Sequence, residues 1–453
     1  MPSQPNQFAL LRQRRFAPFF WTQVCGAAND NLFKFAFTVL VTYQIQVAWL
    51  PPALAGLVIS ALFILPYLLF SATSGQLADK LDKSRLMRFV KSLEVVIMLL
   101  AGIGFLTQNV VLLLFCIFLM GTHSTLFGPV KYAYLPQMLD EHELTGGNGM
   151  VEMGTFAAIL LGNVAGGLIV DLPGVGPLAV SASCLAVALL GRALAQAIPD
   201  VPATDPGLRV NWNPVTETWR NLRLAHANPL VFRSLLGISW MWFFGAVFLS
   251  QFPSLARDVL HGDAQVASLL LVVFSVGIGV GSLLCEVLGR REVEIGLVPL
   301  GAAGMTLFAV DLYFASRSLP ASPLMGVSAF VGQAMDVRVV VDLVLLGLSA
   351  GVYSVPMYAL IQLRSQASHR ARIIAANNIL NALFMIVSAI LAGVLLQAGC
   401  TVPQVFLCTA LANAAVTAYV FWRVPDYWTR CVAWLRSTAW HPAAKSKALG
   451  DAD

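Results

Sequence analysis

The stretch "GQLADKLDKSRL", residues 75–86, is a short charged segment between two long apolar segments. A similar segment, "LCEVLGRREV" (residues 284–293), follows an apolar segment in the second half of the chain. Two other segments also correspond, "NGMVE" (148–152) and "NNILN" (377–381). Alignment pairs Asp79 with Glu286, Lys83 with Arg290, Asn148 with Asn377 and Glu152 with Asn381. We therefore predict a chain of two halves built on one plan.

The composition indicates a membrane protein. Hydrophobic residues make up 58% of the 453 residues and charged residues only 11%, with a mean hydropathy of +0.76. A soluble globular chain carries about 25% charged residues. Apolar windows long enough to span a bilayer lie near residues 17–46, 53–76, 86–106, 109–134, 148–171, 177–198, 231–256, 264–288, 295–315, 340–362, 373–398 and 402–424. Two groups of six spans are the plan of many secondary transporters, with the substrate site between the halves.

The windows divide the chain into four predicted parts. Residues 1–198 form an N-terminal six-helix bundle and residues 231–425 a C-terminal one. Residues 199–230 form a linker that contains an amphipathic helix, "NPVTETWRNLRLAHA", which we expect to lie at the membrane interface. Residues 426–453 form a short tail.

Lysine and arginine predict the orientation. With the N-terminus in the cytoplasm, nearly all of the 28 basic residues fall in cytoplasmic segments. The exceptions are Arg257, Arg317 and Arg338 on the outer side and Lys34 and Lys131 within spans. This distribution follows the positive-inside rule, so both termini are predicted to be cytoplasmic.

Polar residues inside the first-half spans are candidates for a substrate site, because charges within a membrane are costly. The candidates are Asn29, Asp30, Asn31, Lys34, Lys131, Asn148, Glu152 and Asn163. The spacing of Asp30 and Lys34 allows either an internal ion pair or a ligand site. Lys131 and Glu152 have similar predicted depths, which suggests a pair or a shared site. We expect Glu94 to pair with Lys91.

The second-half spans offer aromatic and apolar side chains instead. We expect Trp240, Trp242, Phe243, Tyr353 and Tyr358 to form an apolar wall. Asp311 has no role that the sequence explains. One charged and one apolar wall suit an amphiphile with a charged head and a single acyl chain. If the charged head contains a phosphodiester and an ammonium group, Lys131 with Asn29 or Asn148 would bind the phosphodiester. Asp30 and Glu152 would then bind the ammonium group.

The stretch "GQLADKLDKSR" resembles the loop motif between spans 2 and 3 of the major facilitator superfamily, although Asp82 stands where that family usually has glycine. The resemblance implies an all-α polytopic fold of 12 transmembrane helices in two six-helix bundles. It also implies a conformational latch formed by Gly75, Asp79, Lys83, Arg85, Glu286 and Arg290. We expect Asp79 to cap or pair with the end of a neighbouring helix, and Lys83 and Arg85 to face phospholipid headgroups.

Three further segments resemble the lysophospholipid transporter family within that superfamily. They are "GAANDNLFK" (26–34), "FGPVKYAYLP" (127–136) and "GGNGMVEMGTFAAILLGNVAGG" (146–167). The resemblance implies movement of lysophospholipid from the outer to the inner leaflet of a bacterial inner membrane. A lysophospholipid acyltransferase that re-acylates the product is the implied partner. We expect membrane lipids as further partners, a monomer, no nucleic acid, no cofactor and no metal.

Other functions remain possible at this stage. A proton-coupled exporter of drugs or small metabolites could share this fold, but such relatives usually carry an arginine in span 4, and residues 114–127 contain none. His123 could titrate instead. A lipid-modifying enzyme is disfavoured, because the chain has neither an HxxxxD pair nor a GxSxG elbow. A receptor or scaffold without transport activity would keep the same fold.

Overall fold

The computed structural model describes residues 6–45, 47–317 and 323–439. The first six long helices are α1 (Ala17–Val39), α2 (Pro52–Lys80), α3 (Lys83–Leu106), α4 (Val110–Met138), α5 (Glu141–Val170) and α6 (Gly176–Gln196). The next six are α8 (Pro229–Ser254), α9 (Ala264–Leu288), α10 (Leu297–Ser316), α12 (Ala334–Arg364), α13 (Arg370–Gln397) and α14 (Val402–Arg423). The shorter helices are η1 (Gln7–Arg12), η2 (Leu40–Gln44), α7 (Pro214–His226), η3 (Leu255–Val259), α11 (Val327–Phe330), η4 (Ala367–His369) and α15 (Pro425–Ala439).

These helices confirm the predicted fold class. In the described part of the chain, 11 helices are long and apolar enough to cross a membrane. The twelfth, α1, has 23 residues but a lower hydropathy, because Asn29, Asp30, Asn31 and Lys34 lie within it. The protein is thus a multi-pass membrane protein, and its least apolar span is the one with the most candidate site residues.

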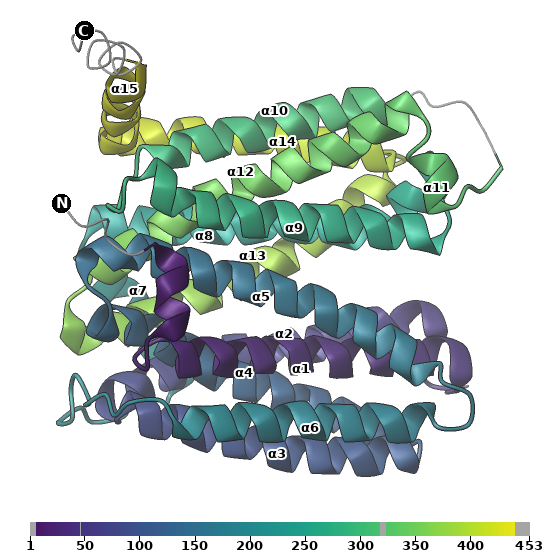
Figure 1. Ribbon diagram of the computed structural model, residues 1–453, viewed down its shortest axis with the longest axis horizontal. Helices are drawn as coiled ribbons and strands as arrows, with labels where there is room; N and C mark the ends of the chain where they lie inside the picture. Colours follow the sequence, from purple (N-terminus) through teal and green to yellow (C-terminus); the bar gives the residue numbers. More distant parts are fainter. Residues whose placement is uncertain (1–5, 46, 318–322, 440–453) are drawn as a thin grey trace, which may run out of the picture.

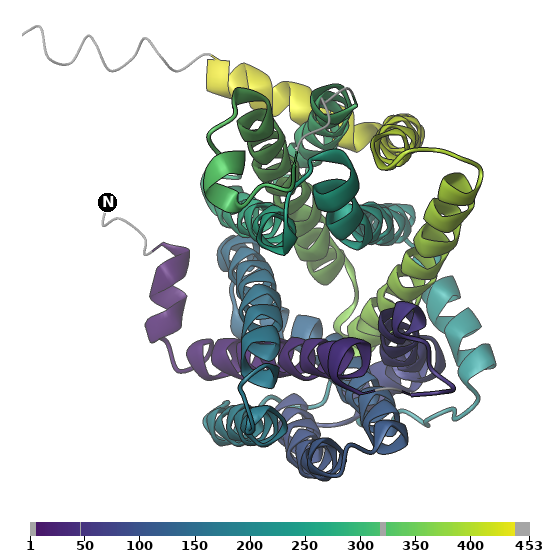
Figure 2. The ribbon, with the colours of Figure 1, turned by 90° about the vertical axis from the view of Figure 1, so that its right-hand side faces the viewer.

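The long helices form two groups (Figure 1). We call α1–α6 the first bundle, and α8–α10 with α12–α14 the second bundle. Figure 2, which looks along the helices, shows the first bundle below and the second above. The turn between α2 and α3, helices α7 and α15, and η1 all lie at the left-hand end in Figure 1. We call this the terminal end and the opposite one the far end.

Helices α1 and α5 pack closely because α5 carries glycines at the contact. A Cβ atom on Gly162 would lie 2.4 Å from the carbonyl oxygen of Ala28, and one on Gly166 would lie 2.6 Å from that of Leu32. Side chains of ordinary size would force the helices apart. The Gly-x-x-x-Gly spacing of α5 therefore allows the close contact with α1.

Gly166→Ala is expected to destabilise the protein by about 1–3 kcal/mol, because the added methyl group collides with rigid backbone. Thermal unfolding in detergent measures this effect. Gly393→Ala in α13 is the matched control, since nothing lies within 4 Å of its added Cβ atom. Equal unfolding temperatures for the two variants would contradict the tight contact between α1 and α5.

The predicted linker helix is present as α7, and its outward face is apolar. Val215 and Trp219 are exposed, whereas Glu217 and Asn221 face the protein and are fully buried. A helix with aromatic and apolar side chains outside suits a membrane interface. The first part of the predicted tail forms α15, and its remainder, residues 440–453, lies outside the described residues.

Candidate functional site

A central cavity of about 380 Å³ lies between the two bundles. Its lining residues come from α1–α5, α8, α12 and α13. The lysine, histidine and acidic residues among them all belong to the first bundle: Asp30, Lys34, Lys91, His123, Lys131 and Glu152. The predicted concentration of charge on one wall is therefore present.

The second bundle contributes aromatic, amide and apolar side chains to the cavity. They are Trp242, Tyr358, Asn378, Asn381, Ala382 and Met385. This wall is more polar than predicted, because α13 turns two amides toward the cavity. Asn381 and its repeat counterpart Glu152 line the cavity from opposite bundles.

Three residues of the predicted apolar wall are not among the cavity-lining residues. Trp240 donates a hydrogen bond from Nε1 to Asn413 Oδ1 (2.8 Å) on α14. Phe243 stacks on Trp240, with ring centroids 4.7 Å apart. Tyr353 is buried against Gly237, where a Cβ atom would lie 3.1 Å from its hydroxyl oxygen. These side chains pack inside the second bundle, so only Trp242 and Tyr358 remain from that prediction.

Asp30 does not pair with Lys34. Its Oδ2 atom accepts a hydrogen bond from Ser124 Oγ (2.5 Å) on α4, and its Oδ1 atom is buried without a partner in the described structure. The Lys34 ammonium lies 5.0 Å from the centre of the Phe63 ring. The ion-pair alternative is therefore wrong, and both groups face the cavity with unused hydrogen-bonding capacity.

Lys131 and Glu152 share the cavity without forming a salt bridge. The Lys131 ammonium lies 4.7 Å from the centre of the Tyr132 ring. Glu152 accepts a hydrogen bond from the Tyr132 hydroxyl (3.3 Å), and its second oxygen has no partner among the described residues. Of the two alternatives, the geometry matches a shared site.

Glu94 anchors a buried polar cluster beside the cavity. It forms the predicted ion pair with Lys91. Its carboxylate also accepts a hydrogen bond from Asn29 Nδ2 (2.7 Å) and lies 3.1 Å from His123 Nε2. Asn29 is fully buried and does not line the cavity. Asn29 is therefore corrected from a ligand candidate to a partner of Glu94.

The other predicted asparagines occupy different places. Asn31 lines the cavity and donates to the carbonyl oxygen of Ala27 (2.8 Å). Asn148 exchanges two hydrogen bonds with Gln362 of the second bundle (2.7 and 3.0 Å). Asn163 is half-buried and outside the cavity lining. Neither Asn148 nor Asn163 is placed to meet a ligand in the cavity.

An aromatic layer joins the bundles beside the cavity. The rings of Tyr132 and Tyr358 are parallel, with centroids 4.5 Å apart. Trp242 donates to the Tyr358 hydroxyl (3.4 Å) and stacks against Phe156, with centroids 6.4 Å apart. The Asn148–Gln362 pair lies one helical turn nearer the terminal end. The layer and this pair together separate the cavity from the terminal end.

Hydrogen bonds hold the bundles together at the terminal end, and Asp79 makes three of them. Its carboxylate accepts from the backbone N–H groups of Ala371 (3.1 Å) and Arg372 (3.3 Å) and from Arg372 Nε (3.1 Å). The predicted contact of Asp79 with a helix end is thus present, at the N-terminus of α13. A Cβ atom on Gly75 would lie 2.6 Å from Cβ of Ala375, so glycine permits this approach.

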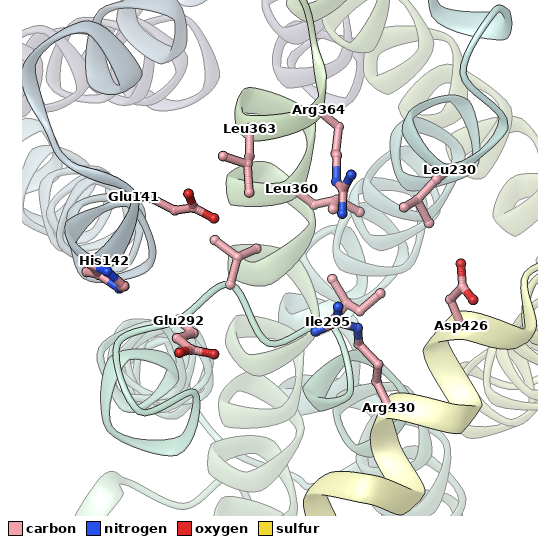
Figure 3. A pocket seen from close by; sticks show the side chains of 11 residues that line it. Glu141, His142, Leu230, Glu292, Ile295, Leu360, Leu363, Arg364, Asp426 and Arg430 are labelled. Carbon is pink, nitrogen blue, oxygen red and sulfur yellow. The ribbon is translucent and has the colours of Figure 1, made fainter.

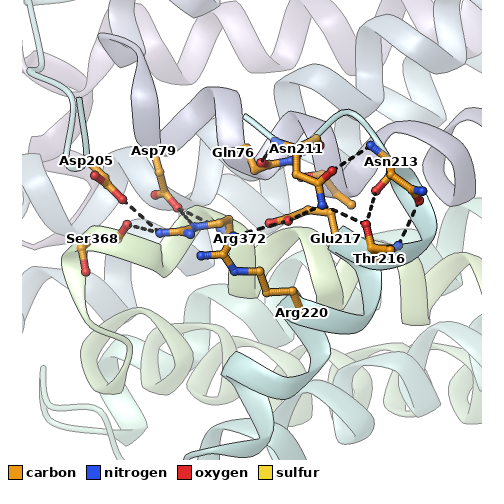
Figure 4. A network of polar contacts seen from close by, with 11 residues as sticks. Gln76, Asp79, Asp205, Asn211, Asn213, Thr216, Glu217, Arg220, Ser368 and Arg372 are labelled. Atoms are coloured by element: carbon orange, nitrogen blue, oxygen red, sulfur yellow. Dashed lines mark hydrogen bonds and ion pairs between the residues drawn. The ribbon is translucent and has the colours of Figure 1, made fainter. Parts of the chain in front are cut away.

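The linker before α7 reinforces this contact (Figure 4). Asp205 lies 3.3 Å from the Arg372 guanidinium, and Gln76 exchanges two hydrogen bonds with the Asn211 backbone (2.9 and 2.7 Å). Asp200 at the start of the linker has a lowered pKa, because Ser84 donates a hydrogen bond to it and Arg88 pairs with it. The linker is therefore bound to the ends of α2 and α3 and to α13.

The basic latch residues differ from the prediction. Arg85 is exposed, but Lys83 is fully buried, and its ammonium has no hydrogen-bond partner among the described residues. The N–H of Lys83 donates to the carbonyl oxygen of Val201 (3.0 Å) in the linker. The expectation that Lys83 faces lipid headgroups is wrong, because the linker binds over the start of α3.

The second-half copy of the latch contacts the N-terminal segment. Glu286 accepts a hydrogen bond from the backbone N–H of Gln7 (3.0 Å), and Gln7 Nε2 donates to Leu283 (2.9 Å). Arg290 forms no ion pair in the described part of the chain and has a positive φ of 53°. The hydrogen bonds from η1 to the second bundle therefore lie at the terminal end, as those of Asp79 do.

Asp311 has a structural partner that the sequence did not reveal. It forms a two-point contact with Arg338, one bond of which measures 3.1 Å from Nε to Oδ2. This pair ties α10 to α12 near the far end. Within the described residues, no group of three or more His, Cys, Asp or Glu side chains is arranged to hold a metal ion.

Several cavity residues were missed by sequence reasoning. Ser124, Tyr132, Asn378 and Met385 are ordinary residues of apolar spans, and only a rotational assignment of each helix would identify them. Such an assignment needs an amphipathic pattern. The spans lack one because lipid and protein core are both apolar.

The sequence of this chain is similar to those of known membrane transporters. Residues 19–337 match the model of the Major Facilitator Superfamily. The lysophospholipid transporter LplT of Serratia proteamaculans is 29% identical over 81% of this chain and 84% of its own length. LplT of Klebsiella pneumoniae is 30% identical over 76% of this chain and 79% of its own length.

Solved structures show the same fold at low identity. FucP in the outward conformation has a TM-score of 0.69 at 14% identity, covering 90% of this chain and 98% of FucP. The human organic anion transporter MFSD10 has a TM-score of 0.70 at 12% identity, covering 92% of this chain and 100% of its own. The chain belongs to the Major Facilitator Superfamily and, within it, to the lysophospholipid transporter family.

Proposed function

We propose that the protein moves lysophospholipids such as lysophosphatidylethanolamine from the outer to the inner leaflet by alternating access. One observation carries this proposal. The central cavity has two ammonium groups, of Lys34 and Lys131, and two carboxylates with unused hydrogen-bonding capacity on one wall, and aromatic, amide and apolar side chains on the other. A zwitterionic head with one acyl chain matches both walls. The similarity to proteins named lysophospholipid transporter supports it.

The head and chain would bind in different parts of the cavity. The Lys131 ammonium would hold the phosphodiester, because a charge-assisted hydrogen bond to phosphate is among the stronger polar contacts. Glu152 and Asp30 would receive the ammonium of the head through the oxygens that have no partner in the described structure. Trp242 and Met385 would contact the acyl chain.

The setting of this activity is part of the proposal. The bacterial relatives support a bacterial inner membrane as the location. The basic residues favour the terminal end in the cytoplasm, which would make the described conformation outward-facing. Residues 1–198 and 231–425 would move as two bodies joined by residues 199–230, with residues 426–453 as the tail. The protein would act as a monomer and deliver its product to a lysophospholipid acyltransferase for re-acylation.

The latch would hold the outward-facing state. Asp79 satisfies N–H groups at the start of α13 and also neutralises Arg372, so separating the bundles exposes both groups. Gln7 and Glu286 make the corresponding connection at the other seam, between η1 and α9. Opening toward the cytoplasm requires both connections to break.

Asp79→Ala is expected to raise terminal-side access by about tenfold, because hydrogen bonds to a charged group are lost. The readout is alkylation of Ser282→Cys, a fully buried position at the seam with α5. Asp82→Ala is the matched control, since the Asp82 carboxylate accepts hydrogen bonds from Ser84 and Arg85 of the first bundle. Equal alkylation rates in the two variants would refute the latch.

The energy source separates the proposal from its main alternative. The protein is reconstituted in liposomes, and movement of labelled lysophosphatidylethanolamine is followed with and without a pH gradient. Movement that needs no proton gradient supports a facilitated flippase. Uptake of drugs or metabolites driven by the gradient would favour a proton-coupled exporter instead, with His123, which lies 3.1 Å from Glu94, as the first residue to substitute.

A further inference from the structure

A second cavity, of about 480 Å³, lies at the terminal end (Figure 3). We call it the terminal-end cavity. It is separate from the central cavity and shares no lining residue with it. The first bundle contributes Glu141 and His142, at the start of α5, and all other lining residues belong to α8 or to later segments: Leu230, Glu292, Val293, Ile295, Leu360, Leu363, Arg364, Asp426 and Arg430.

The charged side chains of this cavity include two arginines with carboxylates around them. Arg364 extends from α12 and Arg430 from α15, and their guanidinium groups approach each other beside Ile295 (Figure 3). Glu141, His142 and Glu292 lie on one side of the two arginines. Asp426 is near the arginines. In the described part of the chain, none of these arginine, glutamate and aspartate side chains has an ion pair or hydrogen bond.

Fixed elements hold the walls in place. The Trp434 indole N–H donates to the carbonyl oxygen of Leu288 (2.8 Å), and the hydroxyl groups of Tyr427 and Ser234 lie 2.7 Å apart. These contacts bind α15 to α9 and α8. Thr145 donates to the carbonyl oxygen of Glu292 (3.0 Å), which binds the α9–α10 loop to α5. These contacts hold the backbone around the cavity, whereas the charged side chains themselves are exposed.

We propose that the terminal-end cavity binds a phosphate-bearing zwitterion of the phosphoethanolamine class. Two converging guanidinium groups are a phosphate site, because each offers parallel N–H donors. The carboxylates across the cavity provide the complementary site for an ammonium group. An inorganic anion would contact only the arginines and would leave the carboxylates without a cationic partner. The volume lies in the range of small-ligand pockets.

The site would also select a conformation. Its ammonium side includes Glu141 of the first bundle, and its phosphate side belongs to the second bundle and α15. Separation of the bundles at the terminal end would pull these sides apart, so the ligand binds the closed terminal end more tightly. A ligand with such a preference shifts the equilibrium toward that state. If the proposed function holds, this ligand binds from the cytoplasmic side and slows transport.

Direct binding tests the proposal without relying on transport. The full chain in phosphatidylglycerol nanodiscs is titrated calorimetrically with glycerophosphoethanolamine and, separately, with inorganic phosphate. Arg364→Ala and Arg430→Ala are each expected to weaken glycerophosphoethanolamine binding about tenfold. Arg423→Ala is the matched control, because Arg423 is exposed, stacks on Trp422 and does not line the cavity. Glu141→Gln should weaken binding of the zwitterion but not of phosphate.

A second arm identifies the source of the headgroup and the effect on conformation. Nanodiscs with added phosphatidylethanolamine should compete with the soluble ligand if the lipid reaches the site. Lack of competition identifies the soluble compound. Bound ligand should slow alkylation of Ser282→Cys. Absent binding, unchanged binding in both arginine variants, or phosphate binding as tightly as the zwitterion would overturn the inference. Intact binding without lysophospholipid movement would instead count against the proposed function.

Discussion

Glu94→Ala is expected to destabilise the protein by about 3–5 kcal/mol, as removal of one member of a buried ion pair does. Glu94 is fully buried. Its carboxylate pairs with Lys91, accepts a hydrogen bond from Asn29 and lies 3.1 Å from His123 Nε2. Its loss leaves the Lys91 ammonium and the Asn29 amide in an apolar interior without their acceptor. Asn29 is fully buried and Lys91 is 1% exposed, although Lys91 and His123 also line the central cavity.

Thermal unfolding in detergent, with expression level as a second readout, measures this loss. The double variant Lys91→Met/Glu94→Leu should unfold at a higher temperature than either single variant, because no unpaired charge then remains. Asp258→Ala is the control for an exposed carboxylate, and we expect a change within about 0.5 kcal/mol. A Glu94→Ala protein as stable as this control would disprove the anchoring role of the cluster.

Lys131→Ala is expected to lower kcat/KM for lysophosphatidylethanolamine by about one to two orders of magnitude, the value of a charge-assisted hydrogen bond. Lys131 lines the central cavity, and its ammonium has no anionic partner within 4 Å in the described structure. The group is therefore free for a phosphate. Its removal takes away attraction and frees no other side chain.

Initial transport rates in proteoliposomes, normalised to the amount of inserted protein, provide the readout. Lys131→Arg should retain a larger part of the activity, because it keeps the positive charge. Lys34→Ala is the comparison within the same cavity, because the Lys34 ammonium also lies over an aromatic ring, and its loss should lower the rate less than the loss of Lys131. Wild-type rates in a normally inserted Lys131→Ala protein would remove Lys131 from the site.

The sequence predicts the fold well, because apolar windows and basic loops report directly on membrane crossing. The same property limits prediction of the site. The rise along a helix gives the depth of Lys131 and Glu152, and both do line the cavity. Rotation about the helix axis is not encoded where every face is apolar, so Trp240 and Trp242 look alike in the sequence but face different surroundings.

Pairings across helices were the hardest feature to predict. Asp30 and Lys34 have the spacing of a helical ion pair, but the Asp30 carboxylate instead accepts a hydrogen bond from Ser124 on α4. Asn29 stands next to Asp30 but turns toward Glu94 on α3. Lys83 belongs to a loop motif that suggests exposure, but the linker segment around Val201 covers it. In each case a segment distant in the sequence decides the partner.

Movement of lipid between leaflets tests the central claim most directly. Labelled lysophosphatidylethanolamine, a diacyl phospholipid and a panel of drugs are each added to proteoliposomes, and protein-free liposomes serve as the control. The account predicts protein-dependent movement of the lysophospholipid that exceeds movement of the diacyl lipid, with no transport of the drugs. Transport of drugs without movement of lysophosphatidylethanolamine would contradict it.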